Sequence, residues 1–361
     1  MRPRRGLIRV ASAFAIIVMA VTAGASADAL AIDFESYTPG TIHGQDGWSS
    51  SGAAGSGCAV YDHAVVDNTG ASYGYPTFAD KSLRISNAVT SGCFGDQTFS
   101  KSLTDEAGES TADNGGMSGG ARQPYFEASW DFASTVPTAE QPGLSTVASP
   151  DRGDGARMSW VQMLDTPTGI DVNFFDVQGV DPMGPPAPCF QCANFVMTNV
   201  ATGLDRTAPH NIKLTMELID GESNDIVQVF VDGTLAHTGG SWEDYYTMDT
   251  ESSPMPPMVS RTVDSILFRT GGGAAPGTLG KGWLIDNLST FSGPVPVVST
   301  CGDPDGDGDN HSNFAPGENE DGPISGVVHE IDQTVVVPVV TDDGGVVPEA
   351  NCAIVKGTLG L

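Results

Sequence analysis

The sequence predicts an all-β protein, and three observations carry this prediction. Short runs in which apolar and polar residues alternate recur from residue 31 to about residue 293, and this period of two is typical of strands with one buried face. The 45 glycines and 24 prolines separate these runs, as expected for turns. Segment 100–109 is the one candidate for an amphipathic helix longer than two turns.

The first strand is expected near the start of AIDFESYTPGTIHGQDGW. We expect Phe34 and Tyr37 to be buried and Asp33 and Glu35 to face water, because neighbouring side chains of a strand point to opposite sides. Trp48 either packs in the core or lines a cleft.

The same alternation marks the later strands. Segments 157–165 and 169–179 are joined by Thr-Pro-Thr-Gly, which predicts a hairpin. Segments 212–218 and 227–231 are separated by a turn rich in Asp and Gly, and Asp232 with the following glycine begins another turn. Strands are also expected at 122–134, 263–273 and 282–291.

Residues 1–27 have the three parts of a secretory signal. Four arginines precede an apolar run at 10–23, and Ala25-Ser26-Ala27 provides a small-residue cleavage site. A membrane anchor is the alternative, but the apolar run is short for a span and nothing basic follows it. We therefore expect a secreted, extracellular protein with no membrane insertion after signal removal.

The chain is strongly acidic, with a formal net charge of −29. Nucleic acids and anionic membrane surfaces are excluded as partners, because such a chain would repel both. The charge favours solubility outside the cell and an affinity for divalent cations.

Six cysteines, an even number in a chain expected to be exported, favour disulfide bonds. They allow fifteen pairings in principle, and their positions favour local pairs: Cys58 with Cys93, Cys189 with Cys192, and Cys301 with Cys352. The sequence CFQC also has the spacing of a zinc or redox site. However, no second Cys-x-x-Cys exists and no βαβ pattern surrounds it, so a local disulfide is favoured.

Three stretches resemble a known family. DFESYTPGTIHGQDGW resembles the first strand of bacterial extracellular domains with the concanavalin A-like lectin/glucanase jelly roll. HNIKLTMELIDGESNDIVQVFVDGTLAHTGGSWEDYY resembles the laminin-G-like (LamG-like) version of that fold, and GWLIDNLST resembles the closing strand that lies beside the first. The resemblance implies a two-sheet antiparallel jelly-roll sandwich over residues 28–293, a fold whose members bind sugars, cleave polysaccharides, or do neither.

The sequence offers no catalytic residue. The glucanases of this fold carry Glu-x-Asp-x-Glu on one strand face, but HEIDQT has Thr334 in the third position and lies outside the jelly roll. EASWDF separates Glu127 from Asp131 by two strand steps. The lyases of this fold use a Gln-x-His strand, and no such triplet occurs. The sequence leaves open whether the protein is an enzyme, and favours that it is not.

Sugar binding needs an exposed aromatic ring beside carboxylates or amides. The segment GGSWEDYY supplies such a set just after a strand, and the predicted glycan-binding residues are Trp242, Glu243, Asp244, Tyr245 and Tyr246. The alternative is that Trp242 and one tyrosine cover the core, since large aromatic side chains are mostly buried.

Residues 294–300 are expected to form a linker, and residues 301–361 a small acidic β-unit. CGDPDGDGDN resembles a thrombospondin type-3 or dockerin-like calcium loop, so the predicted calcium ligands are Asp303, Asp305, Asp307 and Asp309. Phe314 stands where a helix-loop-helix calcium loop has its bidentate glutamate. The alternative is a solvated acidic linker without a metal.

Together these features predict a secreted, non-catalytic protein that binds carbohydrate or mediates surface adhesion, with a polysaccharide or cell-surface glycan as its partner. A polysaccharide-degrading glycosidase or lyase of the same fold is the first alternative. A structural cell-envelope protein without a small ligand is the second.

Overall fold

The structure is a computed structural model that describes residues 28–50, 62–90, 97–103, 124–151, 157–184, 193–219, 223–243, 245, 263 and 265–296. Several predicted features lie outside these residues. They are the signal peptide, most of the linker, the acidic C-terminal unit with Asp303, Asp305, Asp307 and Asp309, and the six cysteines. The described residues up to Pro294 belong to one compact unit.

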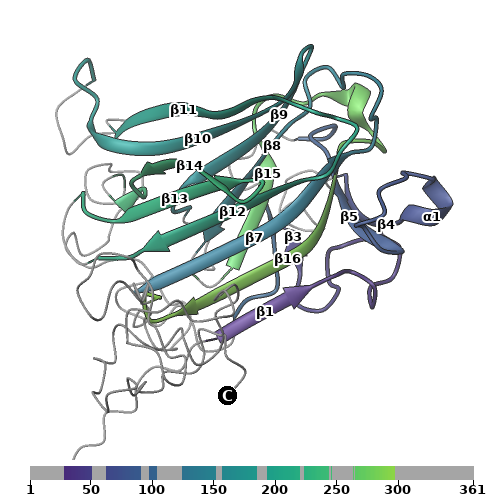
Figure 1. The fold of residues 1–361 in the computed structure, drawn as a ribbon, viewed down its shortest axis with the longest axis horizontal. Helices are drawn as coiled ribbons and strands as arrows, with labels where there is room; N and C mark the ends of the chain where they lie inside the picture. Colours follow the sequence, from purple (N-terminus) through teal and green to yellow (C-terminus); the bar gives the residue numbers. More distant parts are fainter. Residues whose placement is uncertain are drawn as a thin grey trace, which may run out of the picture. The chain divides into compact units, whose positions relative to one another are not determined.

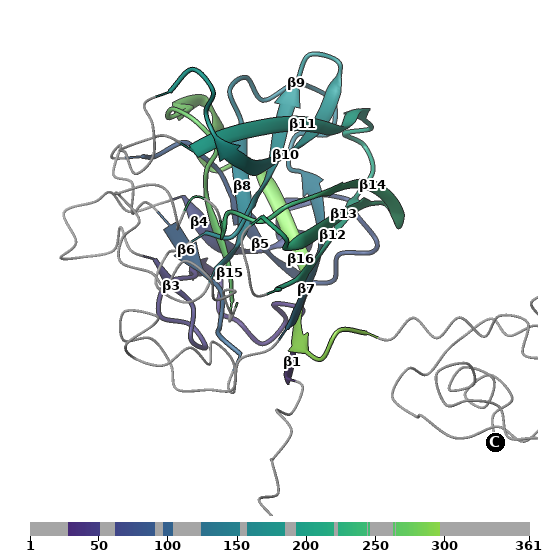
Figure 2. The same ribbon diagram turned by 90° about the vertical axis from the view of Figure 1, so that its left-hand side faces the viewer.

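The first sheet has nine antiparallel strands (Figures 1 and 2). Their order across the sheet is β14 (Thr234–Gly239), β13 (Ile226–Val231), β12 (His210–Glu217), β7 (Tyr125–Ser134), β16 (Trp283–Gly293), β5 (Lys81–Ile85), β4 (His63–Asp67) and β2 (Gly40–Thr41), with β1 (Asp28–Ile32) also paired to β16.

The second sheet has seven antiparallel strands. Their order is β11 (Ala193–Leu204), β10 (Gly169–Val180), β9 (Trp160–Thr166), β8 (Ser145–Asp151), β15 (Ser265–Thr270), β6 (Gln97–Phe99) and β3 (Ser49–Ser50). Sequence neighbours such as β8, β9, β10 and β11 pair directly, whereas β15 joins them from a distant part of the chain.

The core lies between the two sheets. Trp130 on β7 and Phe268 on β15 meet edge to face with ring centroids 6.4 Å apart, and Trp48 stacks on Phe268 at the same distance. All three side chains are fully buried. Each comes from a strand, or the end of one, whose alternate residues point inward. The predicted all-β, two-sheet antiparallel jelly-roll sandwich is therefore confirmed.

The opening strand lies beside the closing strand as the resemblance implied, because β1 pairs with β16. The strand is shorter than expected: it ends at Ile32, and Phe34 has a φ of 61°, which a regular strand does not allow. Phe34, Tyr37 and Trp48 are buried as core residues. Glu35 is only partly exposed because its carboxylate accepts a hydrogen bond from the backbone amide of Lys81.

Two predicted hairpins are confirmed. β9 and β10 pair with Thr166 opposite Gly169, and β12, β13 and β14 pair in succession. Asp232 and Gly233, between β13 and β14, have φ values of 49° and 76°. Two adjacent positive φ angles are what a tight Asp-Gly hairpin turn requires.

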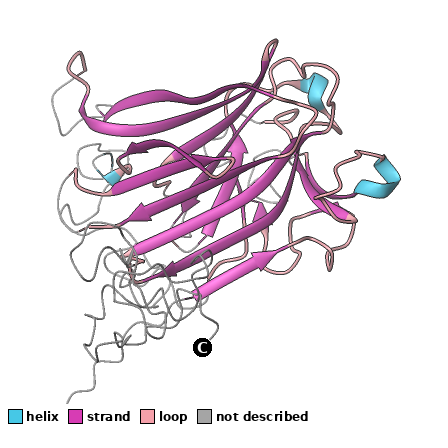
Figure 3. Cartoon of the chain, viewed as in Figure 1, coloured by secondary structure: helices cyan, strands magenta, loops and turns pink. Residues whose placement is uncertain are grey.

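Helix is rare in the part of the chain that the structure describes (Figure 3). It includes α1 (Asn68–Ala71), a 3₁₀ turn at Pro276–Thr278, and the helical residues Glu243 and Tyr245. Residues 100–103 of the candidate helix are not helical, and the rest of that segment lies outside the described residues. None of the helices described here has the length and apolar character needed to cross a membrane.

Candidate functional site

The surface of the seven-stranded sheet turned away from the core is called here the outer face. On β9, Val161 and Met163 are buried in the core, so Trp160 and Gln162 point outward. Their partners across the hairpin are Phe175 and Asn173 on β10. An aromatic pair and an amide pair therefore lie side by side on this face.

Strand β11 extends both pairs by one residue. Asn199 lies opposite Asn173, and Met197 lies opposite Phe175. The result is two parallel rows across three strands: the amide row, Asn199, Asn173 and Gln162, and the apolar row, Met197, Phe175 and Trp160. With strands about 4.8 Å apart, each row spans roughly 10 Å.

The amide row is ordered by its own hydrogen bonds. Asn199 Nδ2 donates to Asn173 Oδ1 (3.0 Å), and Asn173 Nδ2 donates to Gln162 Oε1 (2.9 Å). Gln162 Nε2 in turn donates to Ser145 Oγ on β8 (2.8 Å). Because each amide is held by its neighbour and Asn173 is buried, the row is a fixed chain of hydrogen bonds whose exposed end is Asn199.

The edge of this face is exposed although it is apolar. Met197 is 56% exposed and Phe195, two residues before it on β11, is 44% exposed. An apolar patch of this kind beside polar groups is typical of a binding surface. Trp160 is half-buried, and its indole nitrogen has no hydrogen-bond partner.

Two guanidinium groups lie over the Trp160 ring. The Arg269 group, from β15, is 5.1 Å from the ring centroid, and the Arg157 group is 5.8 Å from it. Both distances are within the range of cation–π attraction. Arg157 also forms a backbone bridge to Asp151, whose side chain is fully buried. Two cations around one ring are notable in a chain with only 16 Lys and Arg residues.

The predicted glycan-binding segment reaches this same face but does not form the exposed platform that was expected. Trp242 is 3% exposed and Tyr245 is 6% exposed. The Trp242 ring packs against Trp160 (5.0 Å) and Phe195 (4.9 Å), and its Nε1 donates to the Phe175 carbonyl (2.8 Å). Both side chains are therefore buried, as the alternative that Trp242 and one tyrosine cover the core expects, and glycan binding by this segment stays a prediction.

The other members of that predicted set have different positions. Glu243 is buried, and its Oε1 accepts hydrogen bonds from the backbone amides of Asn224 (2.6 Å) and Asp225 (3.0 Å). Asp244 and Tyr246 lie outside the described residues. Glu243 therefore holds the turn before β13 in place and is not on the outer face.

The outer surface of the nine-stranded sheet is acidic by comparison. Asp286 on β16 lies directly opposite Asp131 on β7. Burial, with the nearby carboxylates of Glu35 and Asp131, raises the pKa of Asp286 to about 7. Among the described residues, no three His, Cys, Asp or Glu side chains are grouped so as to hold a metal ion. The calcium prediction lies on residues outside this set and stays a prediction.

Sequence reasoning missed the outer-face residues. The strands WVQML and DVNFF were recognised as a hairpin, and their alternation does place Trp160, Gln162, Asn173 and Phe175 on one face. The sequence therefore contained the signal for these four residues. It contained no signal that Arg269 lies on the same face, because β15 is more than a hundred residues from β8, the strand it pairs with.

No protein-family model matches the chain. No curated protein matches it either. Among solved structures, the chain is similar to alginate lyase Aly36B, with 12% identity and a TM-score of 0.41 over 73% of this chain and 96% of that one. It is similar to an endo-β-1,4-glucuronan lyase from the fungus Trichoderma reesei, with 12% identity and a TM-score of 0.36 over 71% and 93%. It is also similar to β-agarase A from Zobellia galactanivorans, with 9% identity and a TM-score of 0.33 over 72% and 82%.

Proposed function

We propose that this protein is secreted and binds a carboxylated polysaccharide across the outer face of the seven-stranded sheet. The observation that carries the proposal is the placement of Arg269 over Trp160, next to the amide row; Arg157 also lies over this ring but is buried. Guanidinium groups pair with carboxylates, amides bond to hydroxyls, and an apolar row accepts the C–H face of a sugar ring. These three chemistries together match an acidic sugar polymer.

The dimensions of the face suit an extended polymer. β11 and β15 are four strand positions apart, which is roughly 19 Å at 4.8 Å per step. The exposed apolar edge at Met197 and the Arg269 side chain lie at the two ends of this span, and the residues of β8, beside β15, are buried. A polymer over β11, β10 and β9 would cover the amide row, with Arg269 beyond it.

The net charge of −29 opposes this binding only at long range. At physiological ionic strength, charges separated by more than about 8 Å are largely screened. The contact with Arg269 acts at shorter distance, so it decides the local attraction. We therefore expect binding to persist at physiological salt and to be no stronger at low salt, where the repulsion is less screened.

The test is retention of the purified chain on immobilised alginate and polygalacturonate, with agarose and cellulose as neutral controls. We expect retention on the carboxylated polymers alone, and loss of retention in Arg269→Ala. Equal retention on neutral polymers would overturn the assignment of the carboxylate. No retention on any polymer would overturn polysaccharide binding itself.

Cleavage by a lyase is the second candidate, and the adjacency of guanidinium and amide donors favours it. Elimination removes a proton from the carbon next to the carboxylate, and donors around that carboxylate stabilise the charge that develops. The reaction also needs a base, and the outward residues named above include no histidine, lysine or tyrosine. An assay for unsaturated products from the same polymers decides between binding with cleavage and binding alone.

A further inference from the structure

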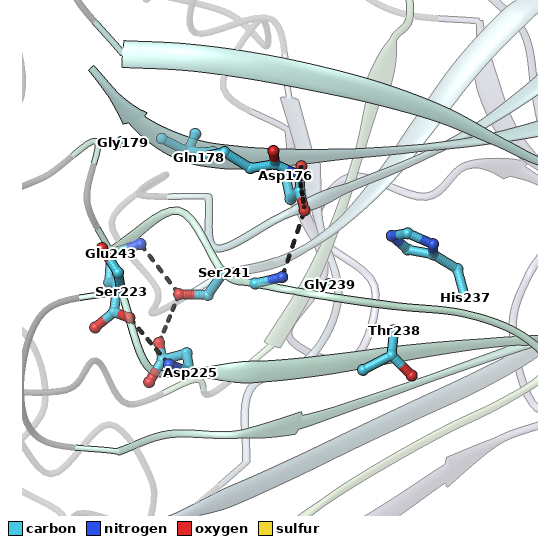
Figure 4. Close-up of a pocket in the computed structure, with 12 residues that line it drawn as sticks. Asp176, Gln178, Gly179, Ser223, Asp225, His237, Thr238, Gly239, Ser241 and Glu243 are labelled. Atoms are coloured by element: carbon cyan, nitrogen blue, oxygen red, sulfur yellow. Dashed lines mark hydrogen bonds between the residues drawn. The ribbon is translucent and has the colours of Figure 1, made fainter. Parts of the chain in front are cut away.

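A pocket lies on the inward side of β10, opposite the outer face (Figure 4). Its volume is about 440 Å³, and it is bordered by the end of β10, the turn before β13, the end of β14 and the segment that follows β14. Phe175 points to the outer face, so Asp176, the next residue, points inward. The pocket is therefore separate from the surface that carries the amide row.

Asp176 is a buried carboxylate with weak partners. It is 2% exposed. Its oxygens accept hydrogen bonds from Gln178 Nε2 at 3.3 Å and from the Gly240 amide at 3.5 Å, all at the long end of the range. None of the ion pairs among the described residues involves it. A buried charge without a cation is costly, so this position is suited to a cation supplied from outside.

His237 provides a second acceptor beside Asp176. Its Nε2 is buried and has no hydrogen-bond partner, and its ring is held 5.2 Å from the Phe174 ring. A Cβ on Gly239 would lie 2.8 Å from Asp176 Oδ2 and 2.9 Å from His237 Nε2. The two acceptors are therefore no more than about 6 Å apart, a gap that one donor group can bridge with two hydrogen bonds of ordinary length.

The rest of the pocket is acidic and hydroxylated. Asp225 accepts hydrogen bonds from the Ser241 hydroxyl and from the Ile219 amide. Glu243 accepts hydrogen bonds from the backbone amides of Asn224 and Asp225, in the turn before β13. Thr238 adds a further hydroxyl to the lining (Figure 4). Among the described residues that line the pocket, none is a lysine or an arginine. It would repel an anion, while its hydroxyls suit a polyhydroxylated molecule.

We propose that this pocket binds a small polyhydroxylated ammonium compound, such as an amino sugar, whose ammonium group bridges Asp176 and His237. A metal ion is not the better occupant, because the described residues include no group of three ligating side chains. The glycine at 239 keeps the gap open, since any side chain there would fill the space between the two acceptors.

The test is calorimetric titration of the full chain with glucosamine, N-acetylglucosamine and glucose. We expect glucosamine to bind with a Kd in the millimolar range, and the two uncharged sugars to bind at least tenfold more weakly (about 1.4 kcal/mol). Asp176→Asn should weaken glucosamine binding about tenfold or more while the thermal midpoint stays the same or rises, because a buried charge is removed.

Gly239→Ala and Gly240→Ala form a matched pair. A methyl group at 239 would enter the gap, whereas one at 240 would meet only the Asp225 carbonyl at 3.8 Å. We expect Gly239→Ala to abolish binding and Gly240→Ala to retain it. Equal binding of glucosamine and N-acetylglucosamine, or unchanged binding in Asp176→Asn, would overturn the proposal. Retention on carboxylated polysaccharide reports separately on the outer face, so the two proposals fail independently.

Discussion

On each sheet, the outer surface places a cation over an aromatic ring, but the side chains around the cation differ. On the nine-stranded sheet, Lys213 lies 5.4 Å from the Phe230 ring and pairs with Glu127 at 3.1 Å. On the seven-stranded sheet, Arg269 and the buried Arg157 share the Trp160 ring, and the buried Asp151 is paired with Arg157 through the backbone. The comparison teaches that a cation over an aromatic ring occurs on both surfaces, so the proposal that the seven-stranded sheet binds polysaccharide depends on the residues around that cation.

The same contrast holds for the carboxylates. The nine-stranded sheet sets Asp286 opposite Asp131, and the crowding contributes to the raised pKa of Asp286. The amide row occupies the comparable outward positions on the seven-stranded sheet. A polyanion would meet repulsion on one surface and hydrogen-bond donors on the other.

The largest effect is expected from the core that both surfaces share. Phe268 contacts Trp130 and Trp48 and is fully buried. Phe268→Ala should lower the free energy of unfolding by about 3–5 kcal/mol, because it leaves a cavity between the sheets. Denaturant unfolding measures this. A loss below about 1 kcal/mol would mean that the sheets do not depend on one core.

The next largest effect is on polysaccharide retention, and it distinguishes Arg269 on the seven-stranded sheet from Lys213 on the nine-stranded sheet. Arg269→Ala should reduce retention on carboxylated polysaccharide by roughly 10- to 100-fold, as expected for a lost charge-assisted pair. The matched control is Lys213→Ala on the other sheet, which should leave retention unchanged. Similar losses in both variants would show that net charge, and not the outer face, governs binding.

A smaller effect, of opposite sign, is expected at Asp286. Its pKa is about 7 in the folded protein against 3.8 in a model compound, so the native state holds a proton that the unfolded state releases between those values. Stability therefore falls as pH rises from about 4 to 7. Asp286→Asn should raise stability by about 2 kcal/mol at pH 8, after allowance for solvent screening, and change it little at pH 4.

Thermal unfolding of wild type and Asp286→Asn across this pH range checks the sign. The two curves should converge at low pH and separate above neutrality. A variant that is less stable than wild type at pH 8 would contradict the description of this surface as crowded with negative charge.

The smallest effect is expected for two asparagine variants, compared by their stability and by their retention on polysaccharide. Asn173 is the centre of the amide row, and Asn211 bonds to Asp131 on the nine-stranded sheet. Each change to alanine should cost about 1 kcal/mol of stability, since partners are left unsatisfied. Only Asn173→Ala should also weaken polysaccharide retention. If Asn211→Ala weakens it equally, the amide row has no special role.

The fold was predictable because its signals are local. Alternation and turn residues located the strands, and the segment around GWLIDNLST was correctly placed beside the first strand. Within the β9–β10 hairpin, a turn closed by Thr166 and Gly169 already determines that Trp160 faces Phe175. That part of the candidate site was present in the sequence, although it was not recognised.

The remainder of the site depends on contacts between distant segments. Strand alternation does not reveal that β15 lies beside β8, so it could not bring Arg269 to Trp160. The expected exposure of Trp242 was not found, for the same reason. Its exposure depends on Phe195 and Trp160, which come from other strands and cover it. Local composition identified an aromatic segment but not its surroundings.

Oxidative footprinting with and without a bound carboxylated polysaccharide tests the central claim most directly. Met197 (56% exposed) and Phe195 (44%) report on the outer face, and Leu235 (47%), opposite Phe230, reports on the nine-stranded sheet. We predict that saturating polymer protects Met197 and Phe195 from oxidation and leaves Leu235 unchanged. Protection of Leu235 with no protection of Met197 and Phe195 would contradict the assignment of the binding surface to the seven-stranded sheet.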